Sequence, residues 1–180
     1  MASTPASLTY RHSIELLAGS IGSKTISYHA ACGGFRGSTT PGKARFDRKS
    51  YDPKLPKSAL PKGKYKLAYL GAPYKHYAGG AVLLWPSDQV LNTLNGSTRS
   101  TNDFLIHGPG KIGSEGCIVL YHGEHYKEVM KKFKEAYGTV DWSKSDSEKW
   151  HGTLEVVDEP VKGWEKKMLD YFDPFKQRTA

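Results

Sequence analysis

Apolar residues in this chain come in short runs that are closed by turn-forming residues. Residues 104–106 and 118–120 are such runs, and residues 81–85 form a third that ends at Pro86. Runs of this length are typical of buried strands. A composition with 19 glycines and 38% hydrophobic residues also fits a loop-rich β protein better than a helical bundle. The sequence therefore predicts a mainly β fold.

Periodicity predicts the remaining elements. Further strands are expected at residues 13–17, 25–29, 64–70 and 153–157. One amphipathic helix is expected at residues 123–137, where apolar residues recur at i, i+3, i+4, i+7 and i+11, namely Tyr126, Val129, Met130, Phe133 and Tyr137. We interpret this stripe as core packing rather than a cofactor site. Short helical additions are expected at residues 88–94 and near the C-terminus.

The length of 180 residues suits a single domain spanning residues 1–180, with its core at about 60–160. Residues 32–62 are rich in Gly, Pro, Lys, Ser and Thr, which predicts a long exposed loop of the kind that often borders a binding groove. Residues 161–180 are expected to form a C-terminal helical extension.

The start of the chain has no apolar segment after a basic one, so we expect no Sec signal peptide and synthesis in the cytoplasm. No window approaches the roughly 20 apolar residues of a membrane span. The formal charge of +8 favours an anionic partner. Because the basic residues are scattered among acids, as in residues 131–135, we interpret them as solvated faces and expect no nucleic-acid site.

The glycine-rich segment between the runs at 104–106 and 118–120 carries the candidate chemistry, because it holds His107, Ser114 and Cys117. An ionised Cys is the most nucleophilic side chain, and an adjacent imidazole can take its proton. His107 stands ten positions before Cys117, and a hairpin-like return would bring the two together. The alternatives are an inert buried thiol at Cys117 and a core histidine bonded to backbone at His107.

The other cysteine, Cys32, stands beside small residues in the string ACGG at 31–34. We interpret it as a buried small hydrophobe. A disulfide with Cys117 is the alternative, and it would silence the nucleophile.

The strings HG at 107–108 and SEGCI at 114–118 resemble the signature of L,D-transpeptidase catalytic domains of the YkuD type. In that family a His-Gly or His-Ser pair precedes a Ser/Thr-His-Gly-Cys segment. Glu115 stands where the larger family usually has His, Val119 stands where it commonly has Arg or Asn, and the spacing between His and Cys is shorter. These features resemble the branch used as antibacterial toxins delivered by type VI secretion. Residues 60–65 are similar to the strand entry of that branch, and the resemblance covers residues 60–121.

The resemblance implies a β-sandwich-like fold of two mixed sheets. It also implies that Cys117 is the acylated nucleophile, that His107 is its base, and that the carbonyl of Gly108 orients the second nitrogen of the imidazole.

Three further residues would support this pair. The N–H groups of Gly116 and Cys117 are the expected oxyanion donors. Ser114 would order the loop or touch substrate, or else serve as a turn hydroxyl. Glu115 would select a charged substrate group, or else be a solvated loop carboxylate.

The implied substrate is the peptidoglycan stem tetrapeptide, processed through a Cys acyl-enzyme without a cofactor. Transfer of the acyl group to water would be an L,D-carboxypeptidase reaction, transfer to a D-amino acid an exchange, and transfer to another stem a cross-link. For the toxin branch we expect a monomer that meets a secretion-machine component and a cognate immunity protein, and that acts in the periplasm of a target bacterium.

Two alternatives stay open. The first is a non-catalytic cell-wall binding module with the same fold. The second is a zinc-dependent hydrolase that uses His122 and His125 together with His107 and Cys117. His122 and His125 precede the expected helix rather than ride on it, so we interpret them as surface residues and expect no metal.

Overall fold

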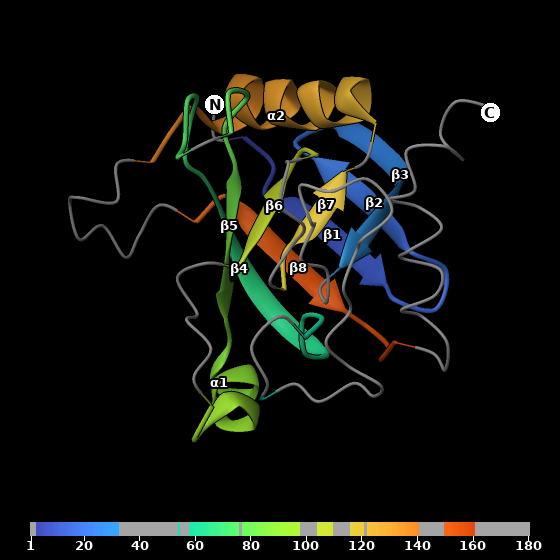
Figure 1. The fold of residues 1–180 in the computed structure, drawn as a ribbon. Helices are drawn as coiled ribbons and strands as arrows, with labels where there is room; N and C mark the ends of the chain where they lie inside the picture. Colours follow the sequence, from blue (N-terminus) through green and yellow to red (C-terminus); the bar gives the residue numbers. More distant parts are fainter. Residues whose placement is uncertain are drawn as a thin grey trace, which may run out of the picture.

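The computed structural model describes residues 3–32, 54, 58–75, 77–97, 104–109, 116–120, 122–140 and 150–160. Eight strands in this part of the chain form a closed barrel in the order β1-β2-β3-β7-β6-β5-β4-β8 (Figure 1). The strands are β1 Ala6–Arg11, β2 Leu16–Ile21, β3 Lys24–Cys32, β4 Gly63–Tyr69, β5 Val82–Pro86, β6 Leu105–His107, β7 Ile118–Leu120 and β8 Gly152–Val156. The helices are α1 Asp88–Leu94 and α2 Gly123–Tyr137.

The sheet is mixed. Strand β1 pairs in parallel with β8, and β6 pairs in parallel with β7, whereas the other neighbours are antiparallel. The predicted mainly β fold is confirmed, but the sheet is one closed barrel rather than two packed sheets. The sheet closes into a barrel because β1 pairs with β8, which leaves neither strand as an open edge.

The barrel interior holds the main core. Along β4 the side chains of Tyr65, Leu67 and Tyr69 point inward, while Lys64 and Lys66 are exposed. Both helices contribute to this core: α2 lies across one end of the barrel and α1 lies at the other (Figure 1). The buried residues of the helices are Val90 and Leu94 of α1 and Val129, Met130 and Phe133 of α2.

A second apolar cluster lies on the outer wall of β4 to β7, and we call it the outer cluster. Its buried members are Ala68, Ala81, Leu83, Leu105, Cys117 and Val140, and Leu70, Tyr74, Tyr77, Trp85 and Trp150 pack against it. The strand alternation explains it, because every second residue of a barrel strand faces outward. Cys117 therefore belongs to the outside of the barrel wall.

Several sequence predictions are confirmed. The amphipathic helix begins and ends as predicted, at Gly123 and Tyr137, and its C-cap is Gly138 with a φ of +71°. The short helix at 88–94 is α1. The strands predicted at 25–29, 64–70, 81–85 and 153–157 correspond to β3, β4, β5 and β8 with small shifts at their ends. The runs at 104–106 and 118–120 are β6 and β7.

The strand predicted at 13–17 is wrong, because residues 12–15 form a turn between β1, which the prediction missed, and β2. The carboxylate of Asp158 ties down this turn. It accepts hydrogen bonds from the backbone N–H of His12 at 2.6 Å and from the hydroxyl of Ser13. These hydrogen bonds join residues that are 145 and 146 positions apart in the chain. They override the local apolar pattern that predicted a strand here.

The exposed loop predicted at 32–62 is wrong at both of its ends. Cys32 is the last residue of β3, and Ala59 and Leu60 are fully buried in the main core. Most of residues 33–57, and the helical extension predicted at 161–180, lie outside the described residues. Neither helix in the described part of the chain is long and apolar enough to cross a membrane.

Candidate active site

His107 is the last residue of β6 and is almost fully buried, with 1% of its surface exposed. Its Nδ1 atom lies 2.6 Å from the carbonyl oxygen of Gly108. A carbonyl oxygen only accepts hydrogen bonds, so Nδ1 carries the proton and donates it to this bond. In the neutral imidazole the lone pair is therefore on Nε2, which is the atom able to accept a proton.

Cys117 lies directly before β7 and is a buried thiol that forms no disulfide. The parallel register pairs Ile106 with Ile118 and His107 with Val119. Ile106 and Ile118 point into the main core. Successive residues of a strand face opposite sides of the sheet. His107 and Cys117, the neighbours of these two residues, therefore share the outer face of the barrel wall. They are diagonal neighbours on adjacent strands, because Cys117 stands two residues before Val119, the register partner of His107. The barrel thus brings the candidate nucleophile and base to one face.

The hairpin-like return predicted between His107 and Cys117 is wrong, because β6 and β7 run parallel. A hairpin would have produced antiparallel strands. In the parallel arrangement His107 is the last residue of β6, and Cys117 directly precedes the first residue of β7.

Tyr77 covers one face of the His107 imidazole. The two ring centroids are 4.2 Å apart, with an interplanar angle of 26°. Tyr77 lies between β4 and β5, where its backbone exchanges two hydrogen bonds with Tyr74, at 3.1 and 2.8 Å. No sequence signal singled it out, because aromatic residues in a connecting segment carry no periodicity.

Tyr126 of α2 packs against the backbone of the same region. Its hydroxyl donates to the carbonyl of Gly80 at 2.7 Å. A Cβ atom added to Gly108 would lie 2.5 Å from the Tyr126 ring, and one added to Gly79 would lie 2.8 Å from it. Glycine is therefore required at both positions by close packing. Burial raises the pKa of the Tyr126 phenol, which keeps its hydroxyl protonated as a donor.

Gly116, next to Cys117, has a φ of +105°, which is the left-handed region that favours glycine. Ser114 and Glu115 lie outside the described residues. The roles of Gly116 and Cys117 as oxyanion donors stay a prediction, as do those of His107 and Cys117 in catalysis.

Cys32 is separate from the candidate pair. It belongs to the main core, and its Sγ atom accepts a hydrogen bond from the backbone N–H of Leu60 at 3.2 Å. Neither cysteine is oxidised to a disulfide, so the bond considered from sequence is not formed in this structure. The prediction that Cys32 is a buried small hydrophobe is confirmed.

The zinc alternative receives no support from the geometry. His122 is exposed, and His125 lies at the start of α2, where its ring stacks on Tyr28 at 4.3 Å. Among the residues that the structure describes, no group of three or more His, Cys, Asp or Glu side chains is placed to hold a metal ion.

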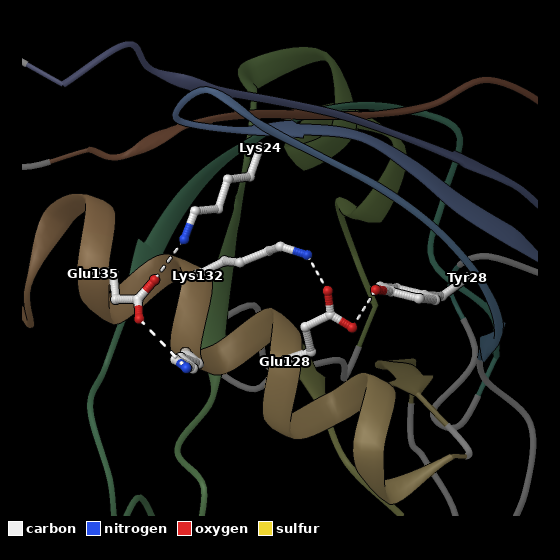
Figure 2. Close-up of polar contacts among 6 residues, drawn as sticks. Lys24, Tyr28, Glu128, Lys132 and Glu135 are labelled. Atoms are coloured by element: carbon white, nitrogen blue, oxygen red, sulfur yellow. Dashed lines mark hydrogen bonds and ion pairs between the residues drawn. The ribbon is translucent and has the colours of Figure 1, made fainter.

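A polar seam joins the exposed side of α2 to β3 (Figure 2). Glu128 accepts from the hydroxyl of Tyr28 at 2.5 Å and pairs with Lys132. Lys24 pairs with Glu135 at 2.8 Å. Hydrogen bonds from Lys132 and Tyr28 lower the pKa of Glu128, while burial and Glu128 raise that of Tyr28 to about 12.

The described residues thus define a closed, mainly β barrel with a cysteine and a histidine on adjacent parallel strands of its outer wall. Comparison of the sequence with models of known protein families finds no match. A search among curated proteins finds no similar sequence.

Proposed function

We propose that this protein is a cysteine acyltransferase that acts on peptidoglycan stem tetrapeptides. The observation that carries the proposal is the shared outer face of Cys117 and His107, with the Nδ1 atom of His107 bonded to the Gly108 carbonyl. This bond leaves Nε2 as the basic atom, which is what a thiol nucleophile needs beside it. The strings HG at 107–108 and SEGCI at 114–118 supply the substrate class through their resemblance to L,D-transpeptidases.

In the proposed reaction Nε2 of His107 takes the proton from the Cys117 thiol. The thiolate attacks the carbonyl carbon of the third stem residue, and the tetrahedral intermediate collapses to a thioester. The terminal D-Ala leaves as an amine after receiving the proton from the imidazolium. Water, a D-amino acid or the amine of another stem then attacks the thioester and releases Cys117.

Hydrolysis or exchange of this kind would weaken the wall of a target cell. We therefore propose the antibacterial toxin branch as the biological setting, with type VI delivery into a periplasm and a cognate immunity protein as partner. A zinc hydrolase would instead lose its activity with a chelator.

Intact-mass spectrometry after incubation with a carbapenem tests the nucleophile, because the β-lactam ring is an acyl donor. We expect one adduct on the wild type and none on Cys117→Ala. Cys32→Ala is the matched control, since it removes the other thiol from the opposite side of the barrel wall and should keep the adduct.

Muropeptide analysis of treated peptidoglycan tests the reaction. Trimmed or exchanged tetrapeptides with the wild type, and unchanged ones with Cys117→Ala, would support the proposal. Unaltered muropeptides together with no carbapenem adduct would overturn it in favour of the binding module.

A further inference from the structure

The imidazole of His107 carries a positive charge once it has taken a proton from the thiol. In that step the S–H bond of Cys117 breaks, its electron pair stays on sulfur, and the proton bonds to Nε2. His107 is only 1% exposed, so water has little access to the cation that results. Burial of this kind disfavours a charged imidazole. A group of the protein that stabilises the cation would therefore favour the proton transfer.

The ring of Tyr77 lies where it can stabilise this cation. Its centroid is 4.2 Å from that of the His107 imidazole, and the two ring planes are inclined by 26°. The electron-rich face of a phenol ring attracts a cation that lies within about 6 Å of its centroid, and the attraction is stronger where water is excluded. The stacked geometry therefore favours the imidazolium over the neutral imidazole.

Backbone hydrogen bonds hold Tyr77 in this position. Its N–H donates to the carbonyl of Tyr74 at 2.8 Å, and its carbonyl accepts from the N–H groups of Tyr74 at 3.1 Å and Gly80 at 3.0 Å. The carbonyl of Gly80 in turn accepts from the hydroxyl of Tyr126 at 2.7 Å. Tyr77 also packs against the outer cluster, to which Cys117 belongs. Its ring is thus in place before the proton moves, and no reorganisation is needed at that moment.

The closest neighbours of β6 bring few ionisable groups to His107. Strands β5 and β7, which flank β6, have no ionisable side chain within their bounds, and Cys117 directly precedes β7. From α2, the ring of Tyr126 faces Gly108. Burial raises the pKa of the Tyr126 phenol, so this group is neutral at pH 7.

The charged groups on the adjoining segments do not account for a stabilised imidazolium. Between β4 and β5, Lys75 brings a positive charge, and its Nζ atom lies 5.5 Å from the centroid of the Tyr74 ring. A cation there opposes protonation of His107. The carboxylates of Glu124 and Glu128, on either side of Tyr126 in α2, form ion pairs with lysines of the same helix.

We propose that Tyr77 is a positioning residue for the proposed reaction, and that its ring face stabilises the His107 imidazolium formed when Nε2 takes the thiol proton. The ring rather than the hydroxyl has this role, because stacking brings the face of the phenol to the imidazole. The inference rests on the proposed function, since it assigns Tyr77 to the proton transfer from Cys117.

The pH dependence of acylation by a carbapenem tests this role. We expect Tyr77→Leu to lower the plateau rate by about 3- to 10-fold and to move the midpoint of the acid limb down by roughly half to one pH unit, the size of a cation–π contact. A less stable imidazolium loses its proton at lower pH, and it is the conjugate acid of a weaker base for the thiol.

Two further variants isolate the ring face. Tyr77→Phe keeps the ring and should behave like the wild type. Tyr74→Leu is the matched control from the same turn, because the Tyr74 ring lies beside Lys75, and it should keep the wild-type midpoint. An unchanged midpoint in Tyr77→Leu would overturn the role, even with a lower rate, since lost packing alone slows the reaction without moving its titration. A midpoint lowered equally in Tyr77→Phe would also overturn it, because the hydroxyl would then be responsible.

NMR separates this inference from the reaction. The imidazole signals of His107 are followed through a pH titration of Cys117→Ala, in which no thiol titrates beside the ring, and are assigned with His107→Gln. We expect the midpoint to be roughly half to one pH unit lower when Tyr77→Leu is added. Equal midpoints would overturn the role of Tyr77 even if the wild type is acylated. A lower midpoint together with no acylation of the wild type would keep the interaction of Tyr77 with His107 and overturn the acyltransferase.

Discussion

At the scale of single residues, Gly108 supports the candidate site in two ways. Its carbonyl holds the Nδ1–H of His107, and its missing side chain leaves room for the ring of Tyr126. That ring has little freedom to move, because its hydroxyl is bonded to Gly80. A side chain at 108 must therefore displace the carbonyl or the ring.

We expect Gly108→Ala to slow acylation of Cys117 by a carbapenem by about 10- to 100-fold, because misplacing a catalytic group by about 1 Å has effects of that order. Gly79→Ala is the control. Its Cβ also meets the Tyr126 ring, at 2.8 Å, but residue 79 does not hold His107. Rates of adduct formation by mass spectrometry compare the two. Equal slowing in both variants would mean that Tyr126 packing alone matters.

His12 is a buried imidazole whose titration affects stability. Burial lowers its pKa to about 4, against the opposing effects of its hydrogen bond to the Leu60 carbonyl and of Asp158. The unfolded chain, with a pKa near 6.5, binds the proton more readily, so stability falls as the pH drops from 6.5 towards 4. Above pH 6.5 the His12 imidazole is mostly neutral in both the folded and the unfolded chain, so this loss of stability is absent there.

We expect the wild type to lose about 2 kcal/mol through His12 between pH 7 and pH 5. His12→Gln keeps a donor for the Leu60 carbonyl but does not titrate, so it should lose less stability over this range. Urea unfolding of both proteins at the two pH values gives the comparison. A parallel loss in both proteins would exclude His12 as the acid-sensitive group.

At the scale of elements, α2 is attached to the barrel by an apolar face and by the polar seam. Phe133 is fully buried in the main core, and its ring lies 6.4 Å from that of Tyr69. The Lys24–Glu135 pair of the seam is exposed, and exposed pairs contribute little because water and salt screen them. The buried face therefore carries the attachment of α2.

We expect Phe133→Ala to lower the free energy of unfolding by about 3–5 kcal/mol, the usual cost of deleting a buried aromatic ring. Lys24→Ala should leave the denaturation midpoint unchanged. Urea denaturation of the two variants measures both effects. A larger loss in Lys24→Ala than in Phe133→Ala would show that the seam dominates.

At the scale of the whole molecule, the barrel is closed by the first and last strands of the described chain. Ala6 of β1 pairs with Gly152 of β8, where the two strands run parallel. Gly152 has a φ of +151°, and a Cβ atom there would lie 2.0 Å from the carbonyl oxygen of Ala6. Closure therefore depends on the absence of a side chain at this position.

We expect Gly152→Ala to lower the free energy of unfolding by roughly 2–6 kcal/mol, because backbone strain and overpacking add. Gly123→Ala is the control, since Gly123 is in α2 and has nothing within 4 Å of an added Cβ. That variant should be unchanged or gain up to about 1 kcal/mol from helix propensity. Thermal and urea unfolding test the pair, and comparable stabilities would contradict this account of closure.

Local pattern was enough for most of the elements. Residues 123–137 carry a 3.6-residue stripe that Gly138 follows, and this pattern predicts the helix with approximately its observed bounds. The runs at 104–106 and 118–120 were predicted as strands, and the residues proposed for the site lie at their ends. The turn at 12–15 escaped prediction because its anchor, Asp158, is distant in the chain.

What the sequence determined by itself is the pattern of apolar positions along most elements and the presence of a cysteine and a histidine at the ends of two strands. Periodicity is a local property, and the side-chain types of Cys117 and His107 are given directly. What only the tertiary structure decided is which strands pair. Backbone hydrogen bonds are nearly independent of sequence, so the parallel pairing of β6 with β7 and the closure of β1 on β8 follow from the packing of the whole barrel. The same packing places Tyr77 against His107 and Tyr126 against Gly108, contacts between residues far apart in the chain.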